Sequence, residues 1–209
     1  MSLPEGVGYR DFGEGTRLAT KGEPVGAEAV SDGWRAWDPR RSKVAAMLDR
    51  ELELGLSSGD TVLYLGAAAG STVSHIADVV GPTYAVEFAA RPMRELVRVA
   101  TDRSNLFPLL KDAREPETYA HVVEADIDVL VQDVATRGQA TVAHRNREFL
   151  RDGGRLVLAI KARSEDVTAD PDTVFDRVIA ELESTYEILE TASLNPQHAD
   201  HLAVIATPR

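Results

Sequence analysis

The stretch TVLYLGAAAGSTVSHIADVVGPTYAVEF, residues 61–88, decides the fold class. Its apolar run at residues 62–65 has the length and flanks of a strand that is buried on both faces. The small residues 66–70 predict a tight turn, and apolar side chains at helical spacing predict a helix directly after it. A second apolar run, residues 84–86, predicts another strand, which ends at Glu87. The order strand, turn, helix, strand, acid is typical of a nucleotide-binding βαβ unit.

The turn and the acid together predict a nucleoside site. Small residues let a ligand approach the backbone, and a helix that begins near Ser71 directs free N–H groups and its positive dipole end toward that ligand. A carboxylate at the tip of the next strand, Glu87, can accept both hydroxyls of a ribose. Turns rich in glycine and alanine also occur without a ligand, so the acid is the deciding feature.

The spacing of the glycines favours one cofactor. Dinucleotide-binding folds usually carry G-x-G-x-x-G, whereas Gly66 and Gly70 lie four residues apart with alanine between them. The Walker phosphate-loop pattern is absent, because the turn contains no lysine and no Gly-Lys-Ser/Thr follows it. S-adenosylmethionine fits better, since it has no pyrophosphate and the turn need only admit its methionine part and its ribose.

Length and composition limit the class of protein. A chain of 209 residues with 44% hydrophobic residues is long enough for one well-buried domain and a small appendage. No apolar segment approaches the length of a membrane span, and the first residues lack a signal-peptide core. With no cysteine for a disulfide or a thiolate metal site, we expect a cytoplasmic protein.

The charge pattern bears on nucleic-acid binding. A net charge of −11 disfavours a polyanionic partner. Lysine is scarce, however, and the acids are spread along the chain, a composition that resembles proteins of organisms with molar salt in their cytoplasm. At such salt the Debye length is about 3 Å. Local contacts, and not the net charge, then determine whether a polyanion binds. An ordinary acidic mesophilic enzyme is the alternative. Four of the 23 lysine and arginine residues are lysines: Lys21, Lys43, Lys111 and Lys161.

The rest of the chain extends the alternating pattern. Residues 1–33 predict a small antiparallel β appendage, and residues 34–209 predict the main domain. Trp34 and Trp37 are expected to pack at the junction of the two. A helix is expected from Arg40 to near Gly55. The later elements are helices at 92–101, 118–123, 138–151 and 171–182 and strands at 106–110, 127–133, 155–161, 186–194 and 201–207, with Gly153-Gly154 as a turn.

This alternation predicts an α/β fold with a parallel sheet covered by helices, and the last two strands predict an antiparallel edge hairpin. Together they describe the Rossmann-like, seven-stranded fold of S-adenosylmethionine-dependent methyltransferases. Ligands in such sheets bind outside the carboxyl ends of the strands. Five residues are expected there: Gly66, Glu87, Asp112, Asp133 and Lys161.

Roles follow from these positions. Asp112 and Ala113 are placed to meet the adenine edge, and Asp133 lies nearest the middle of the sheet, where a methyl group would be delivered. Lys161, on the next strand, is expected within reach of Asp133. A buried Lys–Asp pair can be purely structural, but a pair at the ligand edge favours function. In a chain that prefers arginine, a retained lysine suggests a need for a compact or deprotonatable amine.

Seven short motifs follow one another along the chain: WDPRRSK at 37–43, VLYLGAA at 62–68, TVSH at 72–75, YAVEF at 84–88, DAR at 112–114, IKA at 160–162 and DH at 200–201. From about Trp34 onward, these motifs resemble archaeal fibrillarin. The resemblance implies the methyltransferase of box C/D ribonucleoprotein particles, which methylates ribose 2′-hydroxyls of rRNA and tRNA at positions chosen by a guide RNA. It also implies a Nop-type scaffold protein and a kink-turn-binding protein of ribosomal type as partners.

The resemblance implies the site residues as well. Beside Gly66 and Ala67 of the turn, the expected cofactor contacts are Ser71, Thr72, Glu87, Phe88, Asp112, Ala113, Asp133, Val134, Ala135 and Thr136. The implied catalytic set is Lys43, Asp133, Lys161 and His201. Thr136 stands where the family usually has glutamine, so Gln139 nearby is added to the cofactor set. No metal is predicted, since His121, His144 and His198 show no clustered ligand spacing.

The implied reaction is an in-line displacement in which a ribose 2′-oxygen attacks the methyl carbon and S-adenosylhomocysteine leaves. A lysine can take the proton if burial lowers its pKa, or stabilise the developing oxyanion if it stays charged. Two alternatives remain: a methyltransferase of this fold that acts on protein side chains or another RNA position, and a non-catalytic nucleotide-binding subunit of a ribonucleoprotein. Because no basic stripe is evident, the isolated chain is expected to have little activity.

Overall fold

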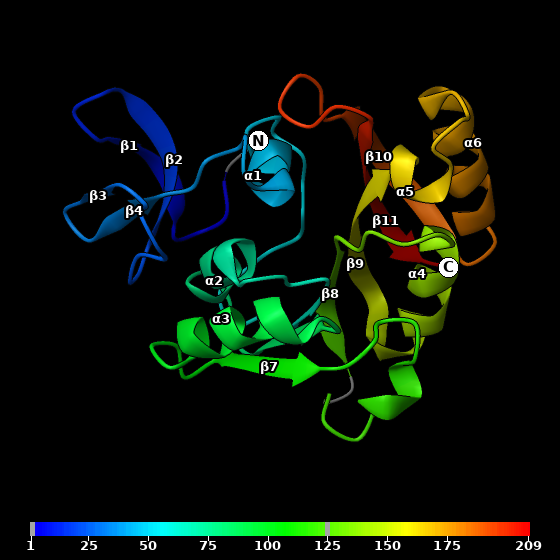
Figure 1. The fold of residues 1–209 in the computed structure, drawn as a ribbon, viewed down its shortest axis with the longest axis horizontal. Helices are drawn as coiled ribbons and strands as arrows, with labels where there is room; N and C mark the ends of the chain where they lie inside the picture. The colour runs from blue at the N-terminus through cyan, green and yellow to red at the C-terminus, as the bar shows by residue number, and fades with distance from the viewer. Residues whose placement is uncertain (1–2, 124–125) are drawn as a thin grey trace.

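Two β-sheets organise the chain, as Figure 1 shows for the computed structural model, which describes residues 3–123 and 126–209. The larger sheet has the strand order β10-β11-β9-β8-β5-β6-β7. Strands β5 to β9 are parallel, and β11 runs antiparallel to both β9 and β10. This order and the final hairpin confirm the predicted seven-stranded, Rossmann-like α/β fold. The bounds are β5 Val62–Leu65, β6 Thr83–Glu87, β7 Leu106–Leu110, β8 Ile127–Gln132, β9 Leu150–Lys161, β10 Tyr186–Ser193 and β11 His201–Pro208.

Helices cover both faces of this sheet. One face carries α1 Lys43–Leu48, α2 Ser71–Ala77 and α3 Ala90–Ala100, and the other carries α4 Gln139–Asn146 and α6 Pro171–Leu182. Strand β5 is buried on both sides, as its apolar run predicts: Val62 and Tyr64 pack toward α1–α3, and Leu63 and Leu65 pack toward α4 and α6. Within the described residues, no helix is long and apolar enough to cross a membrane.

The smaller sheet is antiparallel, with the order β1-β2-β4-β3. Its strands are β1 Val7–Asp11, β2 Thr16–Lys21, β3 Val30–Ser31 and β4 Trp34–Ala36. Because β4 belongs to it, this sheet extends beyond residue 33, the limit expected for the appendage, and residues 1–2 of that prediction lie outside the described part. Trp37 is buried and stacks on His75 of α2, with ring centroids 4.7 Å apart, at the junction of the two sheets.

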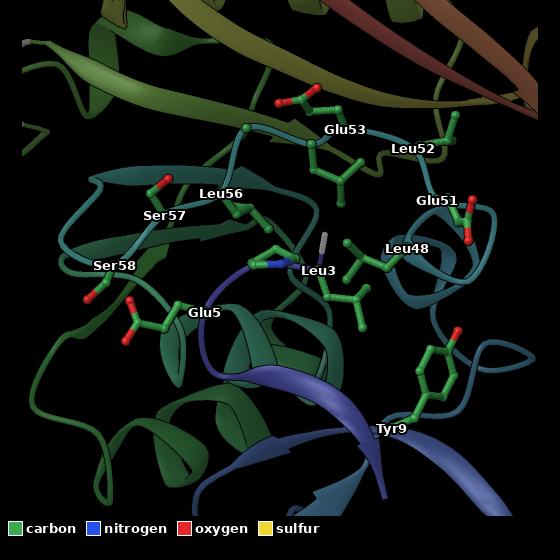
Figure 2. Close-up of a pocket in the computed structure, with 13 residues that line it drawn as sticks. Leu3, Glu5, Tyr9, Leu48, Glu51, Leu52, Glu53, Leu56, Ser57 and Ser58 are labelled. Atoms are coloured by element: carbon green, nitrogen blue, oxygen red, sulfur yellow. The ribbon is translucent and has the colours of Figure 1, made fainter. Parts of the chain in front are cut away.

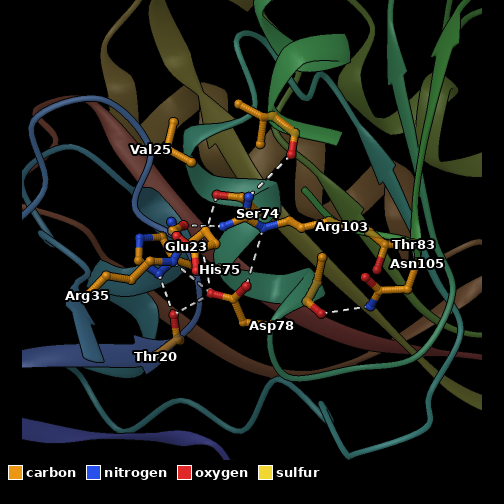
Figure 3. A network of polar contacts seen from close by, with 12 residues as sticks. Thr20, Glu23, Val25, Arg35, Ser74, His75, Asp78, Thr83, Arg103 and Asn105 are labelled. Atoms are coloured by element: carbon orange, nitrogen blue, oxygen red, sulfur yellow. Dashed lines mark hydrogen bonds and ion pairs between the residues drawn. The ribbon is translucent and has the colours of Figure 1, made fainter. Parts of the chain in front are cut away.

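A buried polar network fastens the smaller sheet to helix α2 (Figure 3). Arg35 of β4 donates from Nε to Oδ2 of Asp78, at 2.7 Å, and from its guanidinium to Glu28 at 2.9 Å and to Ser74 Oγ at 3.0 Å. Arg103, which follows α3, also pairs with Asp78 at 3.3 Å. Since Asp78 caps the C-terminal end of α2, this network holds the helix that follows the glycine turn.

Helix α1 is shorter than predicted. It begins at Lys43 because the Ser42 side chain accepts the backbone N–H of Ala45 at 3.2 Å and caps the helix there. It ends at Leu48, whereas the apolar spacing predicted an end near Gly55. The leucines at 52, 54 and 56 are all buried in a segment that forms neither helix nor strand. Every second residue is therefore buried there, and only Leu52 also fits a helical spacing.

Three further predictions were wrong in extent. A 3₁₀ turn at Pro116–Thr118 takes the place of the helix expected at 118–123. The helix expected at 138–151 ends at Asn146, and a 3₁₀ turn at Arg147–Phe149 follows. Gly153 and Gly154 lie inside β9, where the pairing with β8 shifts register, so they form an irregularity in the strand and not a turn before it. A short helix, α5 Ala162–Glu165, was not predicted.

Candidate active site

A cavity of about 420 Å³ opens where strands β5 to β9 end. Ten of the predicted site residues line it: Gly66, Glu87, Phe88, Asp112, Ala113, Asp133, Val134, Ala135, Thr136 and Lys161. The lining also contains Ala68, Val86, Lys111, Arg114 and Val142, which the sequence analysis did not assign to the site. Lys111 and Arg114 flank the Asp112-Ala113 pair, so their position directly after β7 was the available signal.

A second cavity, of about 600 Å³, lies between the N-terminal segment and the loop after α1 (Figure 2). Leucines form much of its wall, and three acids, Glu5, Glu51 and Glu53, contribute to it. Although it is larger, its described lining includes none of the residues at the carboxyl ends of the parallel strands. We therefore assign the ligand site to the smaller cavity, where the fold gathers polar strand ends.

Glu87 is held at the cavity by two backbone groups. Its Oε2 accepts the N–H of Ala68 at 3.0 Å, and its Oε1 accepts the N–H of Ala89 at 2.7 Å. Ala68 has φ +48°, a left-handed conformation that few residues other than glycine adopt readily. Each carboxylate oxygen has a second acceptor position, so the fixed carboxylate retains capacity for the two hydroxyls of a ribose.

Gly66 brings the ends of β5 and β8 together. It has φ +85°, and a Cβ built on it would lie 2.8 Å from the carbonyl oxygen of Asp133. A real side chain cannot occupy that space, so only glycine permits this approach. The turn after β5 and the end of β8 therefore form adjacent walls of one cavity.

Asp133 lies between two lysines from different elements. Lys161 Nζ, at the end of β9, lies 2.9 Å from Asp133 Oδ1 and donates to the Asp133 backbone oxygen at 2.8 Å. Lys43 Nζ, from the first residue of α1, lies 3.2 Å from Oδ1 and 3.4 Å from Oδ2. Oδ1 is within ion-pair distance of both amines, yet among the described residues it accepts no aligned hydrogen bond. The three side chains are 14–18% exposed.

This environment alters the pKa of Lys161. Burial lowers the pKa of Lys161 most, because desolvation disfavours the ammonium form. The Asp133 carboxylate opposes this change, and the Lys43 ammonium adds to it, so the net pKa lies below that of an ordinary lysine. A larger share of Lys161 is thus neutral at a given pH than for a solvent-exposed lysine.

His201 is the fourth predicted catalytic residue. It opens β11 and pairs directly with Lys161 of β9. Its ring Nδ1–H donates to the carbonyl of Ala199 at 2.6 Å. Burial lowers the pKa of His201, and Lys43 and Lys161 lower it further, so the ring is neutral near pH 7. His201 therefore borders the lysine pair as a neutral group.

Four predicted cofactor residues do not line the cavity as described: Ala67, Ser71, Thr72 and Gln139. Ala67 is buried in the core beneath the turn. Burial raises the pKa of the Tyr64 phenol, and the Thr72 side chain lowers it. Gln139 is fully buried, donates to the Lys161 carbonyl at 3.1 Å and accepts the Lys161 N–H at 2.9 Å. Its side chain fixes the end of β9, so we do not carry Gln139 into the cofactor set.

The electrostatics at Asp112 involve one of the missed residues. Arg114 pairs with Asp112 at 2.6 Å, and this hydrogen-bonded pairing lowers the pKa of Asp112. Asp112 is therefore an ionised acceptor at the cavity.

Among residues 3–123 and 126–209, no group of three or more histidine or carboxylate side chains is arranged to hold a metal ion.

Comparison with known proteins identifies the family. The family model described as Fibrillarin matches residues 9–209. A fibrillarin-like rRNA/tRNA 2′-O-methyltransferase of Haloarcula marismortui is 66% identical over 209 residues, which covers 100% of this chain and 99% of that one. This relative comes from a halophile, in agreement with the acidic, lysine-poor composition.

Two crystal structures show the same fold. A chain from a fibrillarin/Nop5p complex has a TM-score of 0.92 and 39% identity and covers 100% of both chains. Aeropyrum pernix fibrillarin in complex with natively bound S-adenosyl-L-methionine has a TM-score of 0.83 and 45% identity, over 92% of this chain and 90% of that one. Sequence and structure thus agree over nearly the whole length, and the chain belongs to the fibrillarin family.

Proposed function

We propose that this chain transfers the methyl group of S-adenosylmethionine to ribose 2′-hydroxyls of rRNA and tRNA, as the catalytic subunit of a box C/D ribonucleoprotein. The observation that carries the proposal is the convergence of Lys43 and Lys161 on Asp133, at the cavity that Glu87 also lines. The activity in the Haloarcula relative's name and the ligand of the Aeropyrum structure support it.

The cavity fits an adenosine-bearing cofactor. We assign the Glu87 carboxylate to the ribose hydroxyls and Asp112 with Ala113 to the adenine edge. Phe88 is 72% exposed at the rim, where its ring can cover an apolar ligand surface. Bound S-adenosylmethionine would supply an electrophilic methyl group beside residues 133–136. A pyrophosphate would instead require a glycine-rich cradle, which the residues of this turn do not form.

Lys161 acts on the ribose hydroxyl in this proposal. The hydroxyl is a weak nucleophile, and its proton must leave as the oxygen–carbon bond forms and the carbon–sulfur bond breaks. The lowered pKa of Lys161 increases the share of neutral amine that can accept that proton. Asp133 orients Lys161, and the Lys43 ammonium stabilises negative charge on the attacking oxygen.

The partners belong to the same proposal. A Nop-type scaffold is supported by the fibrillarin/Nop5p structure, and we add a guide RNA and a kink-turn-binding protein of ribosomal type to recruit the substrate. No basic stripe that could hold RNA is evident in the sequence, so the isolated chain should bind the cofactor but methylate naked RNA poorly. A cytoplasmic location agrees with this assembly.

One experiment tests the function. The chain is reconstituted in molar salt with scaffold, kink-turn protein and guide RNA, given labelled S-adenosylmethionine, and offered a target RNA or the same RNA with a single 2′-deoxy nucleotide at the target position. Label should appear on the first RNA and not on the second. Equal labelling of both RNAs, or label on protein, would contradict ribose methylation. Absence of cofactor binding in calorimetry would instead favour a non-catalytic subunit.

A further inference from the structure

The loop between β10 and β11, residues 194–200, lies over helix α1 (Figure 1). Arg50, just beyond the C-terminal end of α1, donates to the backbone oxygens of Ser193 at 2.9 Å and Asn195 at 2.6 Å. It also bonds to the side chain of Gln197. These contacts fasten the first half of the loop to the C-terminal end of the helix.

His198 fastens the second half of the loop near the other end of α1. Its ring Nε2–H donates to the carbonyl of Pro39 at 2.8 Å. Pro39 lies in a turn in which the Asp38 carbonyl accepts the N–H groups of Arg41 at 3.0 Å and Ser42 at 3.1 Å. Ser42 caps α1, and Lys43 is the next residue. A short series of hydrogen bonds therefore joins His198 to the residue that carries one catalytic amine.

The same loop is anchored at the other catalytic amine. Its last residue, Asp200, accepts the backbone N–H of Ala162 at 3.0 Å. The next residue, His201, pairs with Lys161 across the sheet. The loop thus connects α1, which carries Lys43, to the end of β9, which carries Lys161.

We propose that His198 is a positioning residue that holds the start of helix α1, and with it Lys43, against Asp133 at the catalytic centre. The expected effect of His198 on the rate of methyl transfer rests on the proposed function. The expected effect of His198 on the geometry of the lysine pair is independent of that function. His198 does not touch the reacting atoms in this scheme and acts only through the Pro39 turn.

The surroundings of His198 keep its ring in the state that this contact needs. Lys43 and Asp133 are the charged groups that act on it, and the His201 ring faces it edge-on with centroids 6.0 Å apart. Burial lowers the pKa of His198, and the Lys43 ammonium lowers it further. The neutral ring can donate through Nε2 without adding a positive charge beside Lys43.

Nuclear magnetic resonance of the side-chain amines tests the geometry without any reaction. Protein labelled with ¹⁵N-lysine gives four Nζ groups, which Lys→Arg variants assign. In His198→Asn, whose shorter side chain cannot reach the Pro39 carbonyl, Lys43 should separate from Asp133 and Lys161. Because Lys43 is one cause of the lowered pKa of Lys161, that pKa should rise. In His198→Gln, whose side chain can still donate to the Pro39 carbonyl, the pKa of Lys161 should stay near its wild-type value.

The rate of methyl transfer in the reconstituted particle tests the consequence. Misplacing a catalytic group by about 1 Å can cost about a hundredfold in rate. The rate of methyl transfer in His198→Asn should therefore fall about tenfold to a hundredfold, with cofactor affinity unchanged. His198→Gln should recover most of the lost rate. His121→Asn, at an exposed position, is the matched control.

A wild-type Lys161 titration in His198→Asn would overturn the inference, as would failure of His198→Gln to differ from His198→Asn. A wild-type particle without activity would refute the proposed function and leave the titration as the deciding result.

Discussion

Gly66 and Asp133 approach each other through their backbones, so closely that a Cβ on residue 66 would lie 2.8 Å from the Asp133 carbonyl oxygen. This approach joins the cofactor turn to the strand end that carries the central aspartate. It is the contact through which the ligand-binding half of the site and the proposed catalytic half share one cavity.

Gly66→Ala should therefore damage both halves. It imposes a left-handed conformation on alanine and a backbone clash, and we expect a loss of about 1–3 kcal/mol in the free energy of unfolding. Cofactor affinity should fall about tenfold or more, since each 1.4 kcal/mol is a factor of ten. Gly26→Ala is the control, because Gly26 has φ +67° but open space around it. Urea unfolding and calorimetry measure the two effects, and wild-type values for Gly66→Ala would refute the contact.

Glu87→Gln should weaken cofactor binding selectively. The amide retains one oxygen acceptor, so the contacts with Ala68 and Ala89 cannot both persist while two hydroxyls are bound. Loss of a charge-assisted hydrogen bond costs about 1.5–3 kcal/mol, which predicts an affinity about tenfold to a hundredfold lower by calorimetry. Glu95→Gln, in an exposed pair with Arg98, should bind normally. Equal affinities for the two variants would remove Glu87 from the cofactor site.

Arg35→Met should destabilise the fold strongly. It leaves the buried acids Asp78 and Glu28 without their shared guanidinium partner, and breaking a buried pair from one side costs about 3–5 kcal/mol. Arg98→Met removes a surface partner and should cost at most about 1 kcal/mol. Urea unfolding in molar salt compares the two variants. A similar small loss in both would show that the network does not hold the smaller sheet to α2.

The rate of methyl transfer should depend on pH through Lys161. If neutral Lys161 accepts the proton, the rate rises with pH and levels off above the lowered pKa of Lys161. Lys43→Gln removes a positive charge that depresses that pKa, so its rising limb should shift to higher pH, together with a lower maximum rate. Single-turnover rates across pH measure the shift. A flat profile in the wild type would assign Lys161 an electrostatic role only.

The sequence predicted the strand ends better than the contacts between elements. Glu87 and Asp133 were found because each follows an apolar run, and the parallel order of those runs determines which edge they share. The bonds of Gln139 to the backbone of Lys161 could not be predicted, because the direction of its side chain depends on how α4 packs on β9, which no local pattern records. The role of Gly66 in approaching β8 is likewise a tertiary property. Its positive φ could be suspected from the residue type, but its partner could not.

The loop at residues 194–200 shows the same limit. His198 has no motif spacing that marks it, and the role proposed for it depends on the position of the β10–β11 hairpin over α1. The predicted helix α1 was too long, since the buried leucines of the irregular segment after it partly match a helical pattern. The sequence thus predicted the separate parts of the candidate site. It did not predict the contacts that join residues far apart in the chain.

Methyl transfer by Lys161→Ala in the reconstituted particle tests the central claim most directly. The convergence of Lys161 and Lys43 on Asp133 predicts that this variant binds S-adenosylmethionine with nearly wild-type affinity and yet transfers no measurable methyl group to the target ribose. Transfer at the wild-type rate would contradict the account, because it would show that the amine beside Asp133 takes no part in the reaction.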